Sequence, residues 1–189
     1  MVDRTIRLFD LSGILAVTLL WLGVGVGIAL AELPLIGSKP LSALGTMPES
    51  ALLFNTSVSV SALFFSVYFY RLYRRHRLPA QFALVAFINV AAQFLVGIFS
   101  YEGREQIIHT SAAFTWAFSI PILMRIFYLH ARIRPSILFL RAEYAAVFIG
   151  IGLFVFTEGI APLAEMLPAL PYHAWIMTMA VAGRHHHQP

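Results

Sequence analysis

The chain has no cysteine and few charged residues. The absence of cysteine excludes disulfides and thiolate metal sites. Only 12% of its 189 residues are charged, whereas roughly 25% is usual in soluble proteins. Hydrophobic residues make up 59%, and the mean hydropathy is +0.79. This composition predicts a chain surrounded by lipid, and its length suits a single transmembrane domain over residues 1–189.

Catalytic motifs with a readable spacing are also lacking. The sequence has no P-loop, no HExxH pair and no Ser-His-Asp arrangement. The formal net charge of +4 would suit nucleic acid or anionic lipid, but the basic residues are distributed in a way that favours a membrane surface. We therefore expect membrane lipid and other membrane proteins as partners, and no nucleic acid.

Long apolar runs predict an all-α, polytopic transmembrane bundle, because about 20 mostly apolar residues cross a bilayer as a helix. Six spans are expected, at residues 11–31, 51–70, 79–100, 107–128, 140–157 and 165–183. The first run is longer than the apolar segment of about 7–15 residues in a signal peptide, so we interpret it as a retained helix. The sixth is the weakest: it either tolerates Pro168 and Pro171 or spans incompletely.

Basic residues alternate between the connections. With a cytoplasmic N-terminus, 11 of the 13 Lys and Arg residues lie inside, and only Lys39 and Arg104 lie outside. Because short cytoplasmic loops are enriched in Lys and Arg, this split predicts that both termini are cytoplasmic. We expect the protein in a bacterial inner membrane.

Acidic residues and histidines gather at the predicted outer face. Glu102 and Glu158 follow odd-numbered spans, where the helix dipole disfavours a carboxylate. Even-numbered spans contribute Asn55, Glu105, His109 and His173 on the same side. These residues predict a polar pocket for a lipid headgroup, a cation or a catalytic metal. Alternatively, outer loops simply tolerate acids, and interfacial histidines are membrane anchors.

His109 is the expected centre of this pocket. It shares a helix face with Glu105, four residues earlier, and lies inside a span, where ionisable side chains usually face the protein interior. We expect it to contact Glu102, Glu105 or Glu158, directly or through water. Asn89 and Gln93 are expected to point inward and join helices, and serines and the Gly23–Gly27 glycines to mediate close helix packing.

The segment from the third to the fourth expected span carries a family resemblance. It reads Gly97-Ile-Phe99, then Glu102, Glu105 and His109 ahead of small residues. Together with Leu53-Phe-Asn55 and the basic turn at 71–77, it resembles the six-helix group of DRAM and Sfk membrane proteins, FGF-receptor-activating-protein homologues and related bacterial families. The likeness covers residues 51–127 and implies a six-helix bundle linked to membrane lipid biology. Ser100 and the short last span depart from the group's pattern.

Three functions follow as hypotheses. The first is a lipid-interacting or lipid-organising protein without catalysis. The second is a metal-assisted hydrolase or transferase acting on a lipid headgroup, with histidines and carboxylates of the outer pocket at its centre. The third is a subunit of a larger membrane complex or a b-type haem carrier, for which His109 and His173 are the pair at one depth. The sequence identifies no cofactor and does not select among the three.

Overall fold

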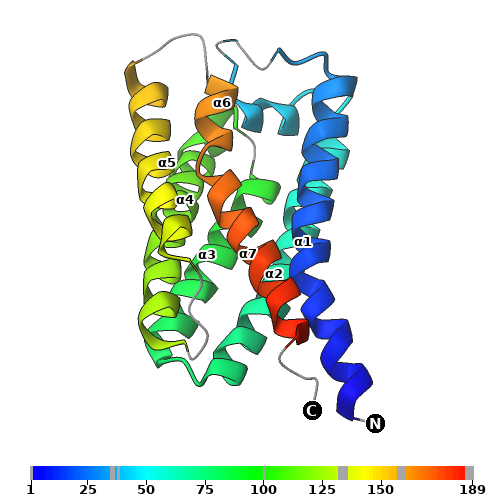
Figure 1. Cartoon of the computed structure of the whole chain (residues 1–189). Helices are drawn as coiled ribbons and strands as arrows, with labels where there is room; N and C mark the ends of the chain where they lie inside the picture. The colour runs from blue at the N-terminus through cyan, green and yellow to red at the C-terminus, as the bar shows by residue number, and fades with distance from the viewer. Residues whose placement is uncertain are drawn as a thin grey trace.

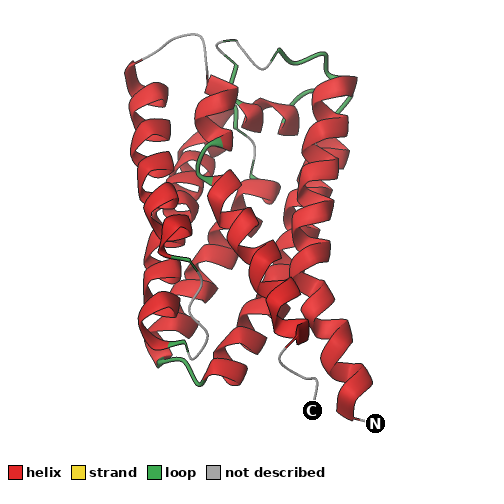
Figure 2. Cartoon of the chain, in the orientation of Figure 1, coloured by secondary structure: helices red, strands yellow, loops and turns green. Residues whose placement is uncertain are grey.

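The computed structural model describes the backbone of residues 2–34, 37, 39–99, 101–131, 136–156 and 161–185. This part of the chain is helical and contains no strand (Figure 2). The elements in order are α1 (Val2–Leu30), the 3-10 helix η1 (Leu41–Gly45), α2 (Ala51–His76), α3 (Ala80–Ile98), the 3-10 helix η2 (Gly103–Glu105), α4 (Gln106–His130), α5 (Ile137–Phe156), α6 (Ala161–Met166) and α7 (Ala169–His185).

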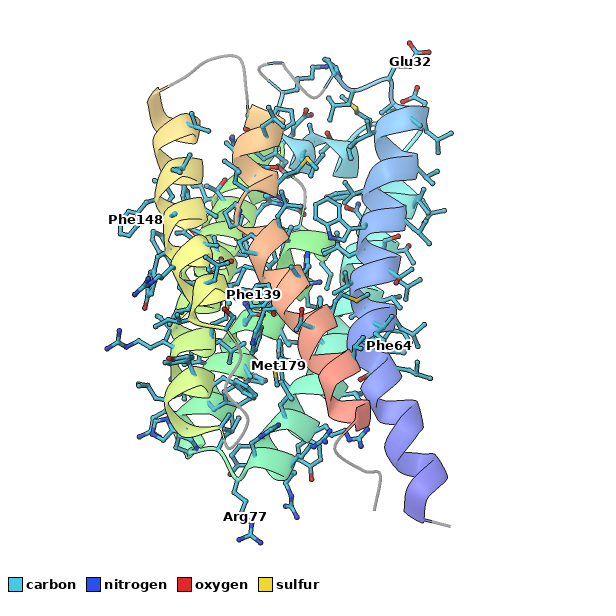
Figure 3. The ribbon with its side chains drawn as sticks, viewed as in Figure 1. Glu32, Phe64, Arg77, Phe139, Phe148 and Met179 are labelled. Atoms are coloured by element: carbon cyan, nitrogen blue, oxygen red, sulfur yellow. The ribbon has the colours of Figure 1, made fainter. Side chains whose placement is uncertain are left out.

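Four helical segments are long and apolar enough to cross a membrane: Leu11–Leu30, Ala51–His76, Ala80–Ile98 and Gly103–His130. Large apolar side chains are exposed, among them Leu52 at 83%. Phe148, 73% exposed, projects outward from α5 (Figure 3). Such exposure is unusual in water and ordinary in lipid. The described helices are thus compatible with a membrane protein, whereas α5 and α7 as fifth and sixth spans stay a prediction.

The long helices run alternately up and down the molecule (Figure 1). Helix α1 packs against α2, α2 against α3 and α3 against α4, while α7 lies along α1 and α5 touches α4, α6 and α7. The start of α1 and the end of α7 lie at the same end as Arg77, and Glu32 lies at the opposite end (Figures 1 and 3). We call these the Arg77 end and the Glu32 end.

A sharp reversal joins α2 to α3 at the Arg77 end. Arg77 adopts a left-handed backbone with φ of 52°, which stops the helix. The N–H of Leu78 then donates to the Tyr73 carbonyl at 3.1 Å, so one carbonyl at the end of α2 keeps a partner. Pro79 precedes the first turn of α3, where its missing N–H costs nothing.

Small residues set the spacing of α1, α2 and α3, as the sequence predicts. A side chain at Gly23 would collide with Ser57, and one at Gly97 would collide with Ser59. Backbones can approach this closely only where both partners are small. Helix α2 therefore packs closely against α1 on one side and against α3 on the other.

Asn89 and Gln93 both point inward, which confirms the expectation for them. Asn89 is fully buried, donates to Ser119 Oγ at 2.8 Å and accepts from the Tyr172 hydroxyl at 3.0 Å. Gln93 is 3% exposed and donates to Ser61 Oγ at 2.6 Å. An amide facing lipid without partners would cost several kcal/mol, which explains the inward orientation.

The last expected span differs from a single helix over residues 165–183. The structure has a short α6 and a separate α7, with the break at Leu167 and Pro168. Proline lacks an N–H and disfavours a helical residue before it, so the helix stops there. Pro171 is tolerated because it falls in the first turn of α7.

Candidate functional site

A cavity of about 180 Å³ lies between the helices toward the Glu32 end. In the same measure a single water needs about 10–15 Å³, so the cavity can admit a group of many atoms. Its walls are mostly apolar, and every long helix contributes to them. The polar or aromatic-polar residues in the wall are Trp21, Ser42, Gln93, Tyr101, His109, Thr110, Trp116 and Glu165; among the described wall residues there is no Lys or Arg.

His109 lines the cavity from the first turn of α4 and is only 2% exposed. Its Nδ1 lies 2.8 Å from the carbonyl oxygen of Phe99. Because a carbonyl can only accept, Nδ1 carries the hydrogen, and in the neutral ring Nε2 then holds a lone pair. That Nε2 is buried without a partner in the described part of the chain. His109 can therefore accept a hydrogen bond from a ligand.

The carboxylate contact expected for His109, directly or through water, stays a prediction, and the structure shows two other contacts. Its hydrogen-bond partner is the Phe99 carbonyl, and the Tyr101 ring packs edge-on with a centroid distance of 5.7 Å. The backbone at the end of α3 needs a donor for its free carbonyls, and His109 supplies one. Glu158 lies outside the described residues.

Gln93 brings a second acceptor to the cavity wall. Its side-chain nitrogen donates to Ser61 Oγ and to the Val58 carbonyl at 3.2 Å, which fixes the orientation of the amide. The opposite atom, Oε1, is buried and has no partner within the described residues. The sequence predicts Gln93 between helices, and the structure adds an unpartnered, buried carbonyl oxygen in a residue of the cavity wall.

Trp116 contributes a donor. It lines the cavity from α4, and its indole Nε1–H is buried without a partner among the described groups. It lies nearly two turns from His109, or about 10 Å along the helix axis and farther from the Glu32 end. An indole N–H donates a hydrogen bond and cannot accept one, so a ligand that pairs with Trp116 must offer an acceptor.

Glu165 and Ser42 close the cavity at the Glu32 end. The Glu165 carboxyl group, on α6, accepts from the Ser42 backbone N–H at 2.9 Å and from the Ser42 hydroxyl at 3.1 Å. Burial raises the pKa of Glu165 from its ordinary 4.5 to about 7, although the hydrogen bonds from Ser42 act in the opposite direction. Glu165 therefore joins α6 to η1 by a contact whose charge changes near neutral pH.

Three other residues proposed for the outer pocket lie away from the cavity wall. Glu102 and Glu105 are exposed around η2. Thr46 Oγ1 lies 3.4 Å from a Glu102 oxygen. Asn55 donates to the Gly45 carbonyl at 3.1 Å and so fastens η1 to the start of α2. These hydrogen bonds of Glu102 and Asn55 thus lead to Thr46 and Gly45, at the Glu32 end.

His173 is also buried, but it forms a hydrogen bond with Trp21 and is not among the residues that line the cavity. The Trp21 indole N–H donates to its Nδ1 at 3.0 Å, so in the neutral ring the hydrogen sits on Nε2. Phe65 stacks on the ring at 5.8 Å. Haem ligation through Nε2 would need that hydrogen moved to Nδ1, where the indole N–H already points. The arrangement therefore opposes the His109–His173 haem pair.

Glu143 on α5 is the other buried ionisable group. It is fully buried, and neither carboxyl oxygen makes a hydrogen bond of good geometry in the described part of the chain, although the Tyr172 backbone N–H lies nearby. The Trp175 indole N–H, on α7, is likewise buried and unpartnered. Neither residue lines the cavity.

Within the described residues, no group of three or more His, Cys, Asp or Glu side chains is arranged to hold a metal ion. The comparisons with known proteins identify no relative: no family model, no curated protein and no solved structure matches the chain.

Sequence reasoning found His109 but missed most of its surroundings. The sequence predicts a helix-joining role for Gln93, and no sequence pattern singles out Glu165 or Trp116. A signal for Gln93 was present, because an amide in a span needs partners for both of its ends. No sequence pattern distinguishes Trp116 from the other two tryptophans.

Proposed function

We propose that the protein is a six-span membrane protein that binds membrane lipid in the cavity, without catalysis. The spans are α1–α5 and α7, with both termini cytoplasmic in a bacterial inner membrane. The Arg77 end carries the basic end of α2, which supports this orientation because cytoplasmic loops are rich in Lys and Arg. The cavity then lies in the outer half of the bilayer.

One observation carries the proposal. His109, Gln93 and Trp116 each hold a buried polar atom without a partner in the described structure, and all three residues line the same largely apolar cavity. An unpaired buried polar group costs about 1–3 kcal/mol, so three at one cavity are a burden unless a ligand supplies partners. An apolar cavity with few polar groups is also the usual form of a small-molecule site.

The described contacts favour lipid binding over the two alternatives. A metal-assisted hydrolase needs several ligands at one point, whereas the described cavity wall offers one imidazole and one carboxyl group already bonded to Ser42. A haem carrier needs one available imidazole nitrogen on each of two histidines. In His173 the hydrogen bond from Trp21 to Nδ1 places the ring hydrogen on Nε2, so Nε2 has no lone pair for iron. We also propose that the protein is a distant relative of the six-helix DRAM and FGF-receptor-activating group.

Lipid retained on purification tests this function. The full chain, extracted in mild detergent and washed, should keep about one lipid per chain in native mass spectrometry. Gln93→Leu should lower that occupancy, because it removes the free Oε1 and fills part of the space. The fold should tolerate the change, since the Ser61 hydroxyl still donates to the Val58 carbonyl at 2.8 Å.

A matched pair of histidines supplies the control. His109→Phe removes the cavity acceptor, whereas His130→Phe changes an exposed histidine on the same helix that also bonds a backbone carbonyl through Nδ1, at 2.9 Å. Occupancy should fall for the first and stay at the wild-type value for the second. Equal occupancy in all variants, or no retained lipid in the wild type, would refute lipid binding in this cavity.

A further inference from the structure

The polar atoms around the cavity follow an order along the membrane normal. His109 lies nearest the Glu32 end and offers an acceptor, Nε2. Trp116 lies deepest and offers a donor. On α3, the Asn89 side-chain nitrogen lies 3.3 Å from the Trp116 carbonyl oxygen, so Asn89 is at the depth of Trp116. Gln93, with its acceptor Oε1, is one turn closer to the Glu32 end, so its depth falls between those of Trp116 and His109. A ligand that satisfies all three must donate at the outer level and accept at the inner level.

Charge narrows the class of headgroup. A phosphate group is anionic and presents mainly acceptor oxygens, which would face the lone pair of His109 and the Gln93 carbonyl oxygen. The described wall has no Lys or Arg to compensate it, and Glu165 adds a carboxyl group. Phosphate and other buried anions are bound where cations or several N–H groups converge. The wall is therefore unsuited to a phospholipid headgroup and suited to uncharged hydroxyls.

The cavity wall also has an apolar side for an acyl chain. Ala113, Phe114 and Ala117 on α4 line the cavity, and Gly150 and Ile151 line it from α5. The side chains of these residues carry no polar atom, so this side of the cavity suits hydrocarbon. A chain attached below the headgroup can lie there.

We infer that the cavity selects an uncharged acylglycerol-type lipid, with hydroxyl groups toward His109 and Gln93 and an ester carbonyl toward Trp116. The inference rests on the proposed lipid binding and adds the class of lipid. Hydroxyls supply the two hydrogens that the acceptors lack, and the ester carbonyl, which lies deeper in such a lipid, accepts from the indole. The lipid keeps its ordinary orientation, headgroup outward.

Tryptophan fluorescence gives a direct test. Two of the three tryptophans, Trp21 and Trp116, line the cavity, and Trp175 is fully buried away from it. In phosphatidylcholine nanodiscs, a monoacylglycerol with a brominated chain should quench part of the fluorescence in a saturable way. Unlabelled monoacylglycerol should reverse the quenching at about a tenfold lower concentration than lysophosphatidic acid of the same chain length.

Variants assign each contact separately. His109→Phe should remove the roughly tenfold preference for monoacylglycerol, and His130→Phe should leave it unchanged. In Trp116→Phe, quenching of Trp21 still reports binding. This change should lower the affinity for monoacylglycerol about tenfold and leave the affinity for a fatty alcohol of the same chain length unchanged, because the alcohol has no ester. Trp175→Phe removes an indole N–H outside the cavity and should leave both affinities unchanged.

The possible outcomes distinguish lipid binding itself from the choice of headgroup. If lysophosphatidic acid competes as strongly as monoacylglycerol does, the headgroup assignment is wrong, whereas lipid binding in the cavity stands. If His109→Phe keeps the preference, the hydroxyl contact is overturned. If no lipid quenches saturably, lipid binding in the cavity fails, and the assignment of the headgroup fails with it.

Discussion

Trp21 on α1 donates its indole N–H to Nδ1 of His173 on α7, at 3.0 Å and across 152 residues of sequence. The bond joins the first long helix to the last, and it fixes which nitrogen of His173 carries the hydrogen. Because α1 and α7 also pack directly, the contact helps to close the helix arrangement into one unit.

Replacing Trp21 should reveal the strength of this contact. Trp21→Phe leaves the buried His173 Nδ1 without a donor and should lower the free energy of unfolding by about 1–3 kcal/mol. Thermal unfolding in detergent measures the loss. Trp175→Phe is the matched control, because that indole N–H has no described partner to lose. Equal losses for both variants would show that ring volume, rather than the hydrogen bond, matters at position 21.

Glu143 should be replaceable with a gain in stability. Both of its oxygens are buried without a hydrogen bond of good geometry in the described structure, with only a weak contact from the Tyr172 backbone N–H, and removing a poorly satisfied polar group from an apolar interior is favourable. Glu143→Leu should raise the free energy of unfolding by about 1–3 kcal/mol, and Glu143→Gln should raise it less because the amide is still polar. Glu102→Leu, at an exposed position, serves as the control. A loss of stability in Glu143→Leu would show that the carboxyl group has a stabilising role.

Glu165 should make stability depend on pH. Its pKa in the folded protein, about 7, lies above its ordinary value of 4.5, so the folded state holds the proton more tightly. The resulting stabilisation is complete below about pH 4.5 and is lost as the pH rises through 7. Glu165→Gln cannot ionise and should flatten the melting temperature over this window. Glu105→Gln, at an exposed position of the same end, should keep the wild-type slope, and an unchanged slope in Glu165→Gln would contradict the assignment.

Reporter fusions should establish the orientation. A fusion after Arg75, near the end of α2, should report a cytoplasmic location, and one after Arg104, in η2, should report an external one. A fusion after Arg134 should again be cytoplasmic. Two adjacent connections on the same side would refute the six-span topology.

Hydropathy predicted where helices occur better than where they end. Helix α1 begins at Val2 instead of residue 11, and α2 continues through its basic turn to His76 instead of ending at Tyr70. A helix persists as long as its backbone hydrogen bonds do, and these extend past the apolar stretch into the polar ends. Helix α6 was hidden because a six-residue helix has no apolar period to recognise.

The amino-acid sequence alone predicts an all-helical chain with several runs suited to a membrane, with Asn89, Gln93 and His109 pointing inward. These properties follow from local composition, because apolar runs need a helical backbone in lipid and polar atoms within them need partners. The hydrogen-bond partners of the buried side chains, by contrast, depend on the packing of the whole chain. Glu165 binds Ser42 across 123 residues, and Trp21 binds His173 across 152. Such pairings depend on how whole helices pack, so no local pattern could select the carbonyl that His109 binds or the three polar atoms left free beside the cavity.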